Sequence, residues 1–318
     1  MPELKRLAIL DDYQDVTLAM GPWDRLPGLE KTVFRDTIAD REALVQRLMP
    51  FDAILAMRER TPFPRALIER LPNLKLLITT GERNRGIDAE ACAERGIVFS
   101  GTPSFGAPTV DLTWGLILSL ARRIPEQVGA LHAGRWQTAL GQGLEGRTLG
   151  VVGLGKLGTK VAKVGQALGM RVIAWSTNLT AEAAAAVGAT RVEKQELFAQ
   201  ADVVTLHLIL SERSRGIVGA TELAAMKPGA MLVNTSRGPL VDQPALLEAL
   251  HAGRIRAGID VYDIEPLPAD HPLLKAPNTV LTPHLGYVTE ENYRAYFQGA
   301  VEAIEAFQAG APIRVIKG

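Results

Sequence analysis

Short apolar strands alternate with helical segments along most of this chain, and this order constrains the fold more than any other feature. A first run extends over residues 6–100 and a second over residues 148–282. Many expected strands are nearly continuous apolar stretches, such as DAILAM (52–57) and LKLLIT (74–79). Strands of this kind, separated by helices, are typical of parallel sheets that are covered on both faces. We therefore predict an α/β protein with two doubly wound parallel-sheet domains.

Two domains also follow from the length, because 318 residues exceed what a single hydrophobic core usually supports. The turn-forming segment SGTPSFGAPTV (100–110) separates the two runs. We expect one domain to comprise residues 1–101 plus 286–318, with the final amphipathic helix crossing back to it. The other domain should comprise residues 102–285.

Composition excludes several function classes. The chain has 35 basic and 35 acidic residues, so a nucleic-acid or membrane-surface partner is not indicated. Its single cysteine, Cys92, cannot form an internal disulfide, and its apolar runs are too short for a signal peptide or a membrane span. The five histidines show no metal-binding spacing. We expect a soluble cytoplasmic protein without a metal site.

A glycine-rich turn begins the second domain's first expected helix. Gly153, Gly155 and Gly158 form G-x-G-x-x-G directly after an expected strand. The first glycine permits a tight turn, the second lets a pyrophosphate approach the backbone, and the third lets helix and strand pack closely. The backbone N–H groups of Lys156 and Leu157 would face the phosphates at the helix N-terminus. This context predicts a dinucleotide site.

The next strand ends without the acid that often grips the adenosine ribose. Ser176 and Thr177 occupy the place where NAD-binding proteins commonly carry Asp or Glu. Serine does not repel a 2′-phosphate, yet no basic residue occurs from 177 to 190 to bind one. NAD and NADP both stay open, with NAD slightly favoured. Ser176 could equally be a simple strand-end cap.

Several stretches of the second run together resemble the D-isomer-specific 2-hydroxyacid dehydrogenase family, which includes phosphoglycerate dehydrogenases, glyoxylate/hydroxypyruvate reductases and formate dehydrogenase. They are GVVGLGKLG (150–158), ADVVTLHLIL (201–210), VNTSRGPLVD (233–242), GIDVYDIEPLP (258–268) and LTPHLG (281–286). The resemblance implies a Rossmann dinucleotide-binding domain, a flavodoxin-like substrate domain, and hydride transfer between a nicotinamide dinucleotide and a D-2-hydroxy acid/2-keto acid pair. It also implies a homodimer formed through the cofactor domain. The substrate itself and the physiological direction stay open.

Three residues fit the catalytic needs of this reaction. Reduction of a 2-keto acid needs a cation for the carboxylate and a proton donor for the developing alkoxide. Arg237 suits the first task because a guanidinium forks onto planar carboxylates, and His284 suits the second. Glu265 can fix the histidine tautomer and favour the imidazolium. By resemblance these are the family's Arg, Glu and His.

The resemblance assigns further residues to the cofactor. Asp260 would accept a hydrogen bond from the nicotinamide carboxamide, and Thr235 and His207 would line the groove. His207 could equally be a buried histidine with a structural role. At Ile209 the family often has proline, so this loop is expected to differ.

The first domain departs most from the family pattern. TTGERNRGID (79–88) stands where relatives often read G-x-G-x-D-N-I-D. The backbone at Thr80 and Gly81 would still hold the substrate carboxylate. Arg58 or Arg83 could point into the cleft and favour a substrate with a polar or anionic tail, or both could be solvated loop arginines.

Two other functions stay as alternatives. Formate oxidation commonly pairs the histidine with Gln, so Glu265 argues against it. A dinucleotide-sensing, co-regulator-like protein could use the same fold, but the presence of Arg237, Glu265 and His284 disfavours it. The helix expected at 111–123 and the Trp136 region suggest a subunit contact, although that helix could also be internal.

Overall fold

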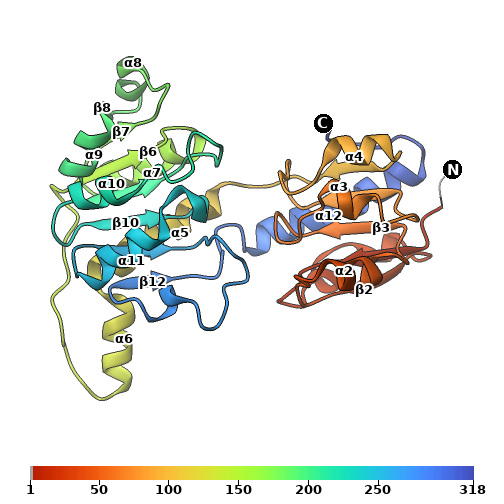
Figure 1. Cartoon of the computed structure of the whole chain (residues 1–318), viewed down its shortest axis with the longest axis horizontal. Helices are drawn as coiled ribbons and strands as arrows, with labels where there is room; N and C mark the ends of the chain where they lie inside the picture. Colours follow the sequence, from red (N-terminus) through yellow and green to blue (C-terminus); the bar gives the residue numbers. More distant parts are fainter. Residues whose placement is uncertain (1–2) are drawn as a thin grey trace. The chain divides into compact units, whose positions relative to one another are not determined.

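The computed structural model describes residues 3–318 and divides into two compact units (Figure 1). Unit 1 comprises the chain up to Phe105 together with Thr289–Gly318, and unit 2 comprises Gly106–Val288. The chain therefore passes into unit 2 and returns, and both crossings lie a few residues beyond the positions expected from sequence. Helix α5 (Ala107–Arg122) begins in the turn-forming segment itself, which moves the first crossing.

Unit 1 is built around a five-stranded parallel sheet within its described residues, in the order β2-β1-β3-β4-β5. This order is that of flavodoxin-like folds. Its strands are β1 (Arg6–Ile9), β2 (Glu30–Val33), β3 (Ala53–Ala56), β4 (Leu76–Thr79) and β5 (Val98–Gly101). Its helices are α1 (Thr17–Met20), α2 (Arg41–Leu48), α3 (Arg65–Ile68), α4 (Ala89–Glu94) and α12 (Glu290–Gln308), with a 3₁₀ turn η1 (Trp23–Arg25).

Unit 2 contains a seven-stranded parallel sheet in the order β12-β11-β10-β9-β6-β7-β8. The order reverses beside β6, as in the Rossmann fold. Its strands are β6 (Thr148–Val152), β7 (Arg171–Trp175), β8 (Thr190–Arg191), β9 (Val203–Leu206), β10 (Met231–Asn234), β11 (Arg256–Ile259) and β12 (Thr279–Leu281). Besides α5, its helices are α6 (Ile124–His132), α7 (Lys156–Ala167), α8 (Ala181–Ala185), α9 (Lys194–Gln200), α10 (Ala220–Ala225) and α11 (Gln243–His251), with 3₁₀ turns η2 (Gly238–Leu240) and η3 (Pro272–Lys275). The two sheets confirm the predicted α/β fold.

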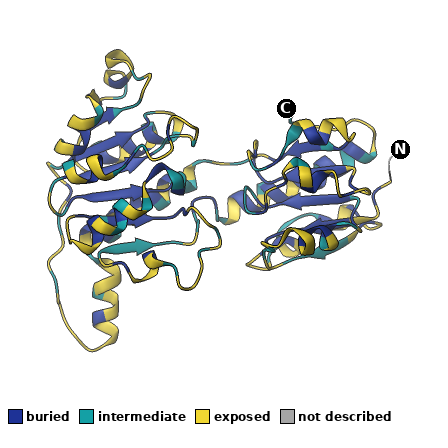
Figure 2. Cartoon of the chain, viewed as in Figure 1, coloured by how far each residue is buried: buried dark blue, intermediate teal, exposed yellow. Residues whose placement is uncertain are grey.

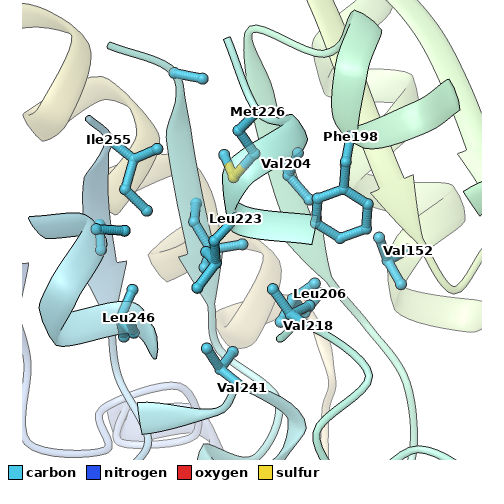
Figure 3. Close-up of a cluster of buried hydrophobic side chains, with 14 of the residues drawn as sticks. Val152, Phe198, Val204, Leu206, Val218, Leu223, Met226, Val241, Leu246 and Ile255 are labelled. Atoms are coloured by element: carbon cyan, nitrogen blue, oxygen red, sulfur yellow. The ribbon is translucent and has the colours of Figure 1, made fainter. Parts of the chain in front are cut away.

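Apolar side chains cover both faces of the unit 2 sheet, which explains why its strands read as continuous apolar runs. On one face Phe198, Leu223 and Leu246, from α9, α10 and α11, pack against strand residues such as Val204 (Figure 3). On the other face α5 and α7 pack on the sheet through a second apolar cluster. Figure 2 shows the central strands of both units as buried. The packing on both faces makes the sheet a rigid scaffold. The loops that follow the carboxyl ends of its strands are therefore the available place for a site.

Helix α6 is the main element that the sequence did not predict. Arg123 adopts a left-handed conformation, with φ of 55°, that ends α5, and α6 starts at the next residue. Most of α6 and the loop after it is exposed (Figure 2), including large apolar side chains. We call these the α6 apolar surface: Ile124, Val128, Leu131, Trp136 and Leu140. Val128 is 49% and Leu131 58% exposed.

The edge of the unit 1 sheet is covered by the chain's last residues. Ser100 of β5 forms an antiparallel bridge with Val315. Gly101 donates its N–H to the carbonyl of Arg314, and Ile316 donates to the carbonyl of Phe99. The C-terminal segment therefore satisfies backbone groups that an edge strand would leave open.

Within residues 3–318, no helix is both long and apolar enough to cross a bilayer. Across the same residues, no three His, Cys, Asp or Glu side chains gather in a way that could hold a metal ion.

Candidate active site

The predicted site residues of unit 2 follow its strands at one edge of the sheet. Parallel strands end at the same edge, and ligands of such sheets bind there, beside the point where the strand order reverses. The glycine turn follows β6, His207 follows β9, and Thr235 follows β10. Asp260 directly follows β11, and His284 follows β12. The topology thus gathers residues that are far apart in sequence.

The glycine turn has the geometry that its sequence predicts. Gly153 has a φ of 98°, which L side chains rarely adopt. A Cβ on Gly158 would lie 2.1 Å from the carbonyl oxygen of Gly153, so only glycine fits there. A Cβ on Gly155, in contrast, would meet nothing within 4 Å. Two glycines are therefore required by the turn itself, whereas Gly155 borders open space.

That open space suits a pyrophosphate. Gly155 is the N-cap of α7, and Lys156, Leu157 and Gly158 are its first helical residues, whose N–H groups have no partner within the helix. A helix N-terminus presents these donors and a partial positive charge to an anion. A side chain at Gly155 would fill the space in which the anion approaches. The residues present therefore fit a dinucleotide.

The turn after β7 is compact. Leu179 donates its N–H to the carbonyl of Ser176 at 3.1 Å. Ser176 is half-buried, and Thr177 and Asn178 are exposed. This turn lies beside the glycine turn, since the N–H of Gly153 donates to the carbonyl of Trp175 at 2.8 Å. Ser176 and Thr177 are thereby placed where an adenosine ribose is held in Rossmann folds.

His207 packs against the glycine turn. A Cβ on Gly153 would lie 2.8 Å from the carbonyl of His207, and the imidazole Nε2 lies 2.9 Å from the hydroxyl of Thr205. Burial lowers the pKa of His207 to about 4, so the ring is neutral near pH 7. It can line a cofactor groove but does not supply a positive charge to it. The neighbouring Ile209 is exposed.

A chain of hydroxyl groups joins β10 to the loop that carries His284. Thr235 and Thr113 share a hydrogen bond of 2.8 Å between their hydroxyls. Thr113 donates to the carbonyl of Thr109, and the Thr109 hydroxyl donates to the carbonyl of Gly286 at 2.8 Å. The first turns of α5 are thus hydrogen-bonded to both Thr235 and the loop that carries His284. Helix 111–123 was expected to be internal or a subunit contact, and in unit 2 most of its inward side is buried.

Asp260 forms hydrogen bonds with the loop that carries His284. Its carboxylate is fully buried and accepts hydrogen bonds from the Thr282 hydroxyl and from the N–H groups of Leu285 and Gly286, at 2.7, 2.7 and 3.0 Å. Burial raises the pKa of Asp260 despite these donors. Between these anchor points His284 has a φ of 54°, in the left-handed region. The hydrogen bonds of Asp260 therefore fix a backbone conformation that the loop would not adopt by itself.

His284 and Glu265 form a hydrogen-bonded pair. The imidazole Nδ1 lies 2.5 Å from Oε2 of Glu265, and the other carboxylate oxygen accepts the N–H of Tyr262 at 2.9 Å. Less than a fifth of either side chain is exposed. The Tyr262 hydroxyl donates to the carbonyl of Thr282 at 2.9 Å, which ties the Glu265 segment to the histidine loop. Of the two ring nitrogens, Nδ1 is the one that the carboxylate engages.

Arg237 lies at the end of β10, just before η2. Its Nη1 donates to the carbonyl of Ser236 at 2.7 Å, and its own carbonyl accepts from the Asn234 side chain at 2.8 Å. A Cβ on Gly238 would lie 2.2 Å from the carbonyl carbon of Tyr262. This close approach sets the Arg237 segment against the segment that leads to Glu265.

The predicted substrate residues lie in unit 1, at the carboxyl edge of its own sheet. Thr80 donates its N–H to the carbonyl of Ala56 at 3.0 Å, and Gly81 donates to the Thr102 hydroxyl at 2.8 Å. Both groups expected to hold a substrate carboxylate are thus engaged within the unit. The Arg58 guanidinium donates to the Thr80 carbonyl at 3.1 Å, while Arg83 is exposed.

The sequence reasoning missed the residues that support the histidine loop. Tyr262, Thr282, Thr109 and Thr113 act through hydrogen bonds whose partners are 4 to 177 residues away. Only the position of Tyr262 and Thr282 inside two of the recognised motifs could have drawn attention to them. Nothing in the sequence signals Thr109.

Comparison with known protein families gives a match over residues 114–286. The matching description is "D-isomer specific 2-hydroxyacid dehydrogenase, NAD binding domain". The match covers the glycine turn and all three residues of the proposed catalytic trio. It covers most of unit 2 and does not extend into unit 1.

Individual proteins show similarity beyond that region. The hydroxypyruvate reductase of Blautia hydrogenotrophica is 30% identical, over 98% of this chain and 99% of that protein. The D-3-phosphoglycerate dehydrogenase of Methanocaldococcus jannaschii is 39% identical over 80% of this chain, but the chain spans only about half (49%) of that protein. A solved structure, described as phosphoglycerate oxidoreductase from Vibrio cholerae O395, is 41% identical with a TM-score of 0.92, covering 96% of this chain and 100% of that one.

Proposed function

Because the chain belongs to the D-isomer-specific 2-hydroxyacid dehydrogenases, oxidoreductases that use a nicotinamide dinucleotide, we propose that it interconverts a D-2-hydroxy acid and its 2-keto acid. The single observation that carries this proposal is the hydrogen bond between His284 Nδ1 and Glu265 Oε2. When bound, the dinucleotide supplies or accepts the hydride at its nicotinamide ring. The remaining tasks fall to side chains of this chain.

His284 moves the proton. With Nδ1 engaged by Glu265, the imidazolium Nε2 donates its proton to the ketone oxygen as negative charge develops there during reduction. In the oxidative direction neutral Nε2 takes the hydroxyl proton. Glu265 stabilises the charged ring and keeps it oriented, and the N–H of Tyr262 keeps Glu265 in place.

Arg237 binds the substrate. A guanidinium can hold the carboxylate of the 2-keto acid through two parallel hydrogen bonds and polarise the adjacent ketone. Its position at the end of β10, against the Tyr262 segment, is consistent with that task. In unit 2 the cofactor residues would be those of the glycine turn, with Ser176, Thr177, His207, Thr235 and Asp260.

The experiment is a substrate panel. Glyoxylate, hydroxypyruvate and pyruvate are each incubated with NADH and with NADPH, and the loss of reduced-cofactor absorbance is followed. We expect turnover of at least one acid, and a loss of about 100-fold or more in kcat for His284→Asn. His251→Asn, which changes an exposed histidine at the end of α11, is the matched control and should keep full activity. Tight cofactor binding without turnover of any acid would instead favour a dinucleotide sensor. Formate is assayed separately with NAD⁺ and NADP⁺, and turnover of formate alone would favour formate oxidation.

We propose that Arg58 or Arg83 selects the substrate's tail. A cation near the tail would favour substrates that carry a second polar or anionic group. Unchanged relative kcat/KM for Arg83→Ala, across lactate-like and dicarboxylate-like substrates, would contradict a role for Arg83. The corresponding test for Arg58 is Arg58→Gln, which removes the positive charge, and unchanged relative kcat/KM across the same substrates would contradict a role for Arg58.

We also propose a homodimer formed through unit 2. The α6 apolar surface supports this, because monomeric proteins seldom expose so many large apolar side chains together. A second copy of the same chain would cover the surface with an identical one, as two-fold symmetry requires. A cytoplasmic location is proposed from the unpaired, buried Cys92.

A further inference from the structure

Arg191 is distant in sequence from the turn after β7, but the fold places it next to that turn. No Lys or Arg occurs between residues 172 and 190, so the turn itself carries no cation. Strand β8 then pairs in parallel with β7, with Arg191 opposite Ala174, and Val192 donates its N–H to the Ala174 carbonyl at 3.1 Å. The first basic residue after the gap therefore lies beside the strand that leads into Ser176.

The Arg191 side chain reaches the turn. Its Nε donates to the carbonyl of Leu179 at 3.1 Å, and Leu179 closes the turn by its hydrogen bond to Ser176. Its Nη1 lies 2.8 Å from a carboxylate oxygen of Glu193. The side chain is 35% exposed, so it is not enclosed by the protein.

We propose that Arg191 receives the 2′-phosphate of NADP(H), and that the chain binds NADPH at least as tightly as NADH. The inference rests on the proposed function, since it concerns the cofactor of the same site. A 2′-phosphate needs a cation and the absence of a carboxylate at the end of the second Rossmann strand. Arg191 provides the cation, and Ser176 and Thr177 provide hydroxyl donors where an acid would repel the phosphate.

Glu193 competes for the same guanidinium but is a weak competitor. Its side chain is 70% exposed, and an exposed ion pair is worth little. It makes no capping hydrogen bond at the start of α9, although it occupies the N-cap position. A phosphate carries more charge and can accept from both Nη groups, so it can displace the Glu193 carboxylate. The Nε anchor on Leu179 can stay in place during that exchange.

The test measures cofactor binding directly. Dissociation constants for NADH and NADPH are obtained by fluorescence titration of the full chain without substrate. Arg191→Gln should raise the Kd for NADPH about tenfold or more and that for NADH less than about twofold. Lys163→Gln, which removes an exposed positive charge from α7 in the same unit, should leave the ratio of the two constants unchanged.

A second variant predicts a change of opposite sign. Glu193→Gln removes the competing carboxylate, so the Kd for NADPH should fall about two- to fivefold while that for NADH stays the same. The inference is overturned if Arg191→Gln weakens both cofactors equally or neither, or if the wild type binds NADH tightly and NADPH far more weakly. If neither cofactor binds, the proposed function fails with it. If NADH binding and turnover are normal but Arg191→Gln leaves the Kd for NADPH unchanged, only the inference about Arg191 fails.

Discussion

Glu265 uses both of its carboxylate oxygens to orient His284: Oε2 lies 2.5 Å from the imidazole Nδ1, and Oε1 accepts the backbone N–H of Tyr262 at 2.9 Å. A carboxylate held at two points cannot rotate without breaking a hydrogen bond. The imidazole is therefore fixed in both tautomer and direction, with Nε2 as its remaining nitrogen.

Replacing this carboxylate with an amide tests its charge. Glu265→Gln can keep a hydrogen bond to His284 but cannot stabilise the imidazolium, so kcat for keto-acid reduction should fall about 10- to 100-fold with little change in KM. Steady-state kinetics on the best substrate of the panel provide the measurement. Glu248→Gln, an exposed position on α11, is the control. Full activity in the Glu265 variant would remove the carboxylate from the mechanism.

Gly155 and Gly158, at the start of α7, should respond differently to substitution by alanine. Gly158→Ala places Cβ against the Gly153 carbonyl and should lower the free energy of unfolding by about 2 kcal/mol or more. Gly155→Ala meets no protein atom within 4 Å, so stability should change by about 0.5 kcal/mol at most while NADH binding weakens. Urea unfolding and cofactor titration on both variants give the comparison. Equal destabilisation of the two, or unimpaired NADH binding by Gly155→Ala, would contradict the role assigned to the open space.

The half-buried imidazole of His207, whose pKa is lowered by desolvation, should make stability depend on pH. Its pKa is about 4 in the folded chain and about 6.5 when unfolded, so the unfolded state binds more protons between these values. Stability should therefore fall as pH decreases from about 6.5 to about 4, by up to about 1.4 kcal/mol per pH unit. His207→Asn can keep a hydrogen bond to Thr205 but does not titrate, and its profile should be flatter. Urea midpoints at pH 7, 6 and 5 decide the matter; parallel profiles for the two proteins would count against it.

The α6 apolar surface should determine the assembly state. Light scattering of the wild type is expected to give twice the 34.3 kDa mass of one chain. Val128→Asp with Leu131→Asp places two charges in the contact and should yield the single-chain mass without unfolding, since both positions are exposed in one copy. Leu18→Asp, at an exposed apolar position of unit 1, is the control. A single-chain mass for the wild type would show that this surface has another role.

The fold could be predicted because its strongest determinants are local. Continuous apolar strands such as Leu76–Thr79 and Met231–Asn234 can be satisfied only by burial on both faces, and this requirement leads directly to covered parallel sheets. Helix α6 escaped prediction because its large apolar residues, Ile124, Val128 and Leu131, are exposed instead of packing in a core. The start of α5 was missed because Pro108 and Gly106 read as a turn, whereas proline is well tolerated in the first turn of a helix.

The site could be predicted only in part. Arg237, Glu265 and His284 were proposed because each belongs to a recognisable motif, and the glycine turn was predicted because its residue types are sterically required. The residues that support the histidine loop were not predicted. A threonine such as Thr109 can serve many structural purposes, and its partner, Gly286, is 177 residues away. Arg191, which we propose for the 2′-phosphate, was not predicted from the sequence because only the pairing of β8 with β7 brings it beside the strand that leads to Ser176.

Residues 314–316, which pair with the edge strand β5, should protect the protein from aggregation. Arg314 and Ile316 form hydrogen bonds with backbone groups of β5 that would otherwise be open to a strand from another molecule. A recombinant version ending at residue 312 would leave that flank unprotected, and its solubility on concentration should suffer before its catalysis does. Replacing residues 314–316 with a purification tag should have the same effect.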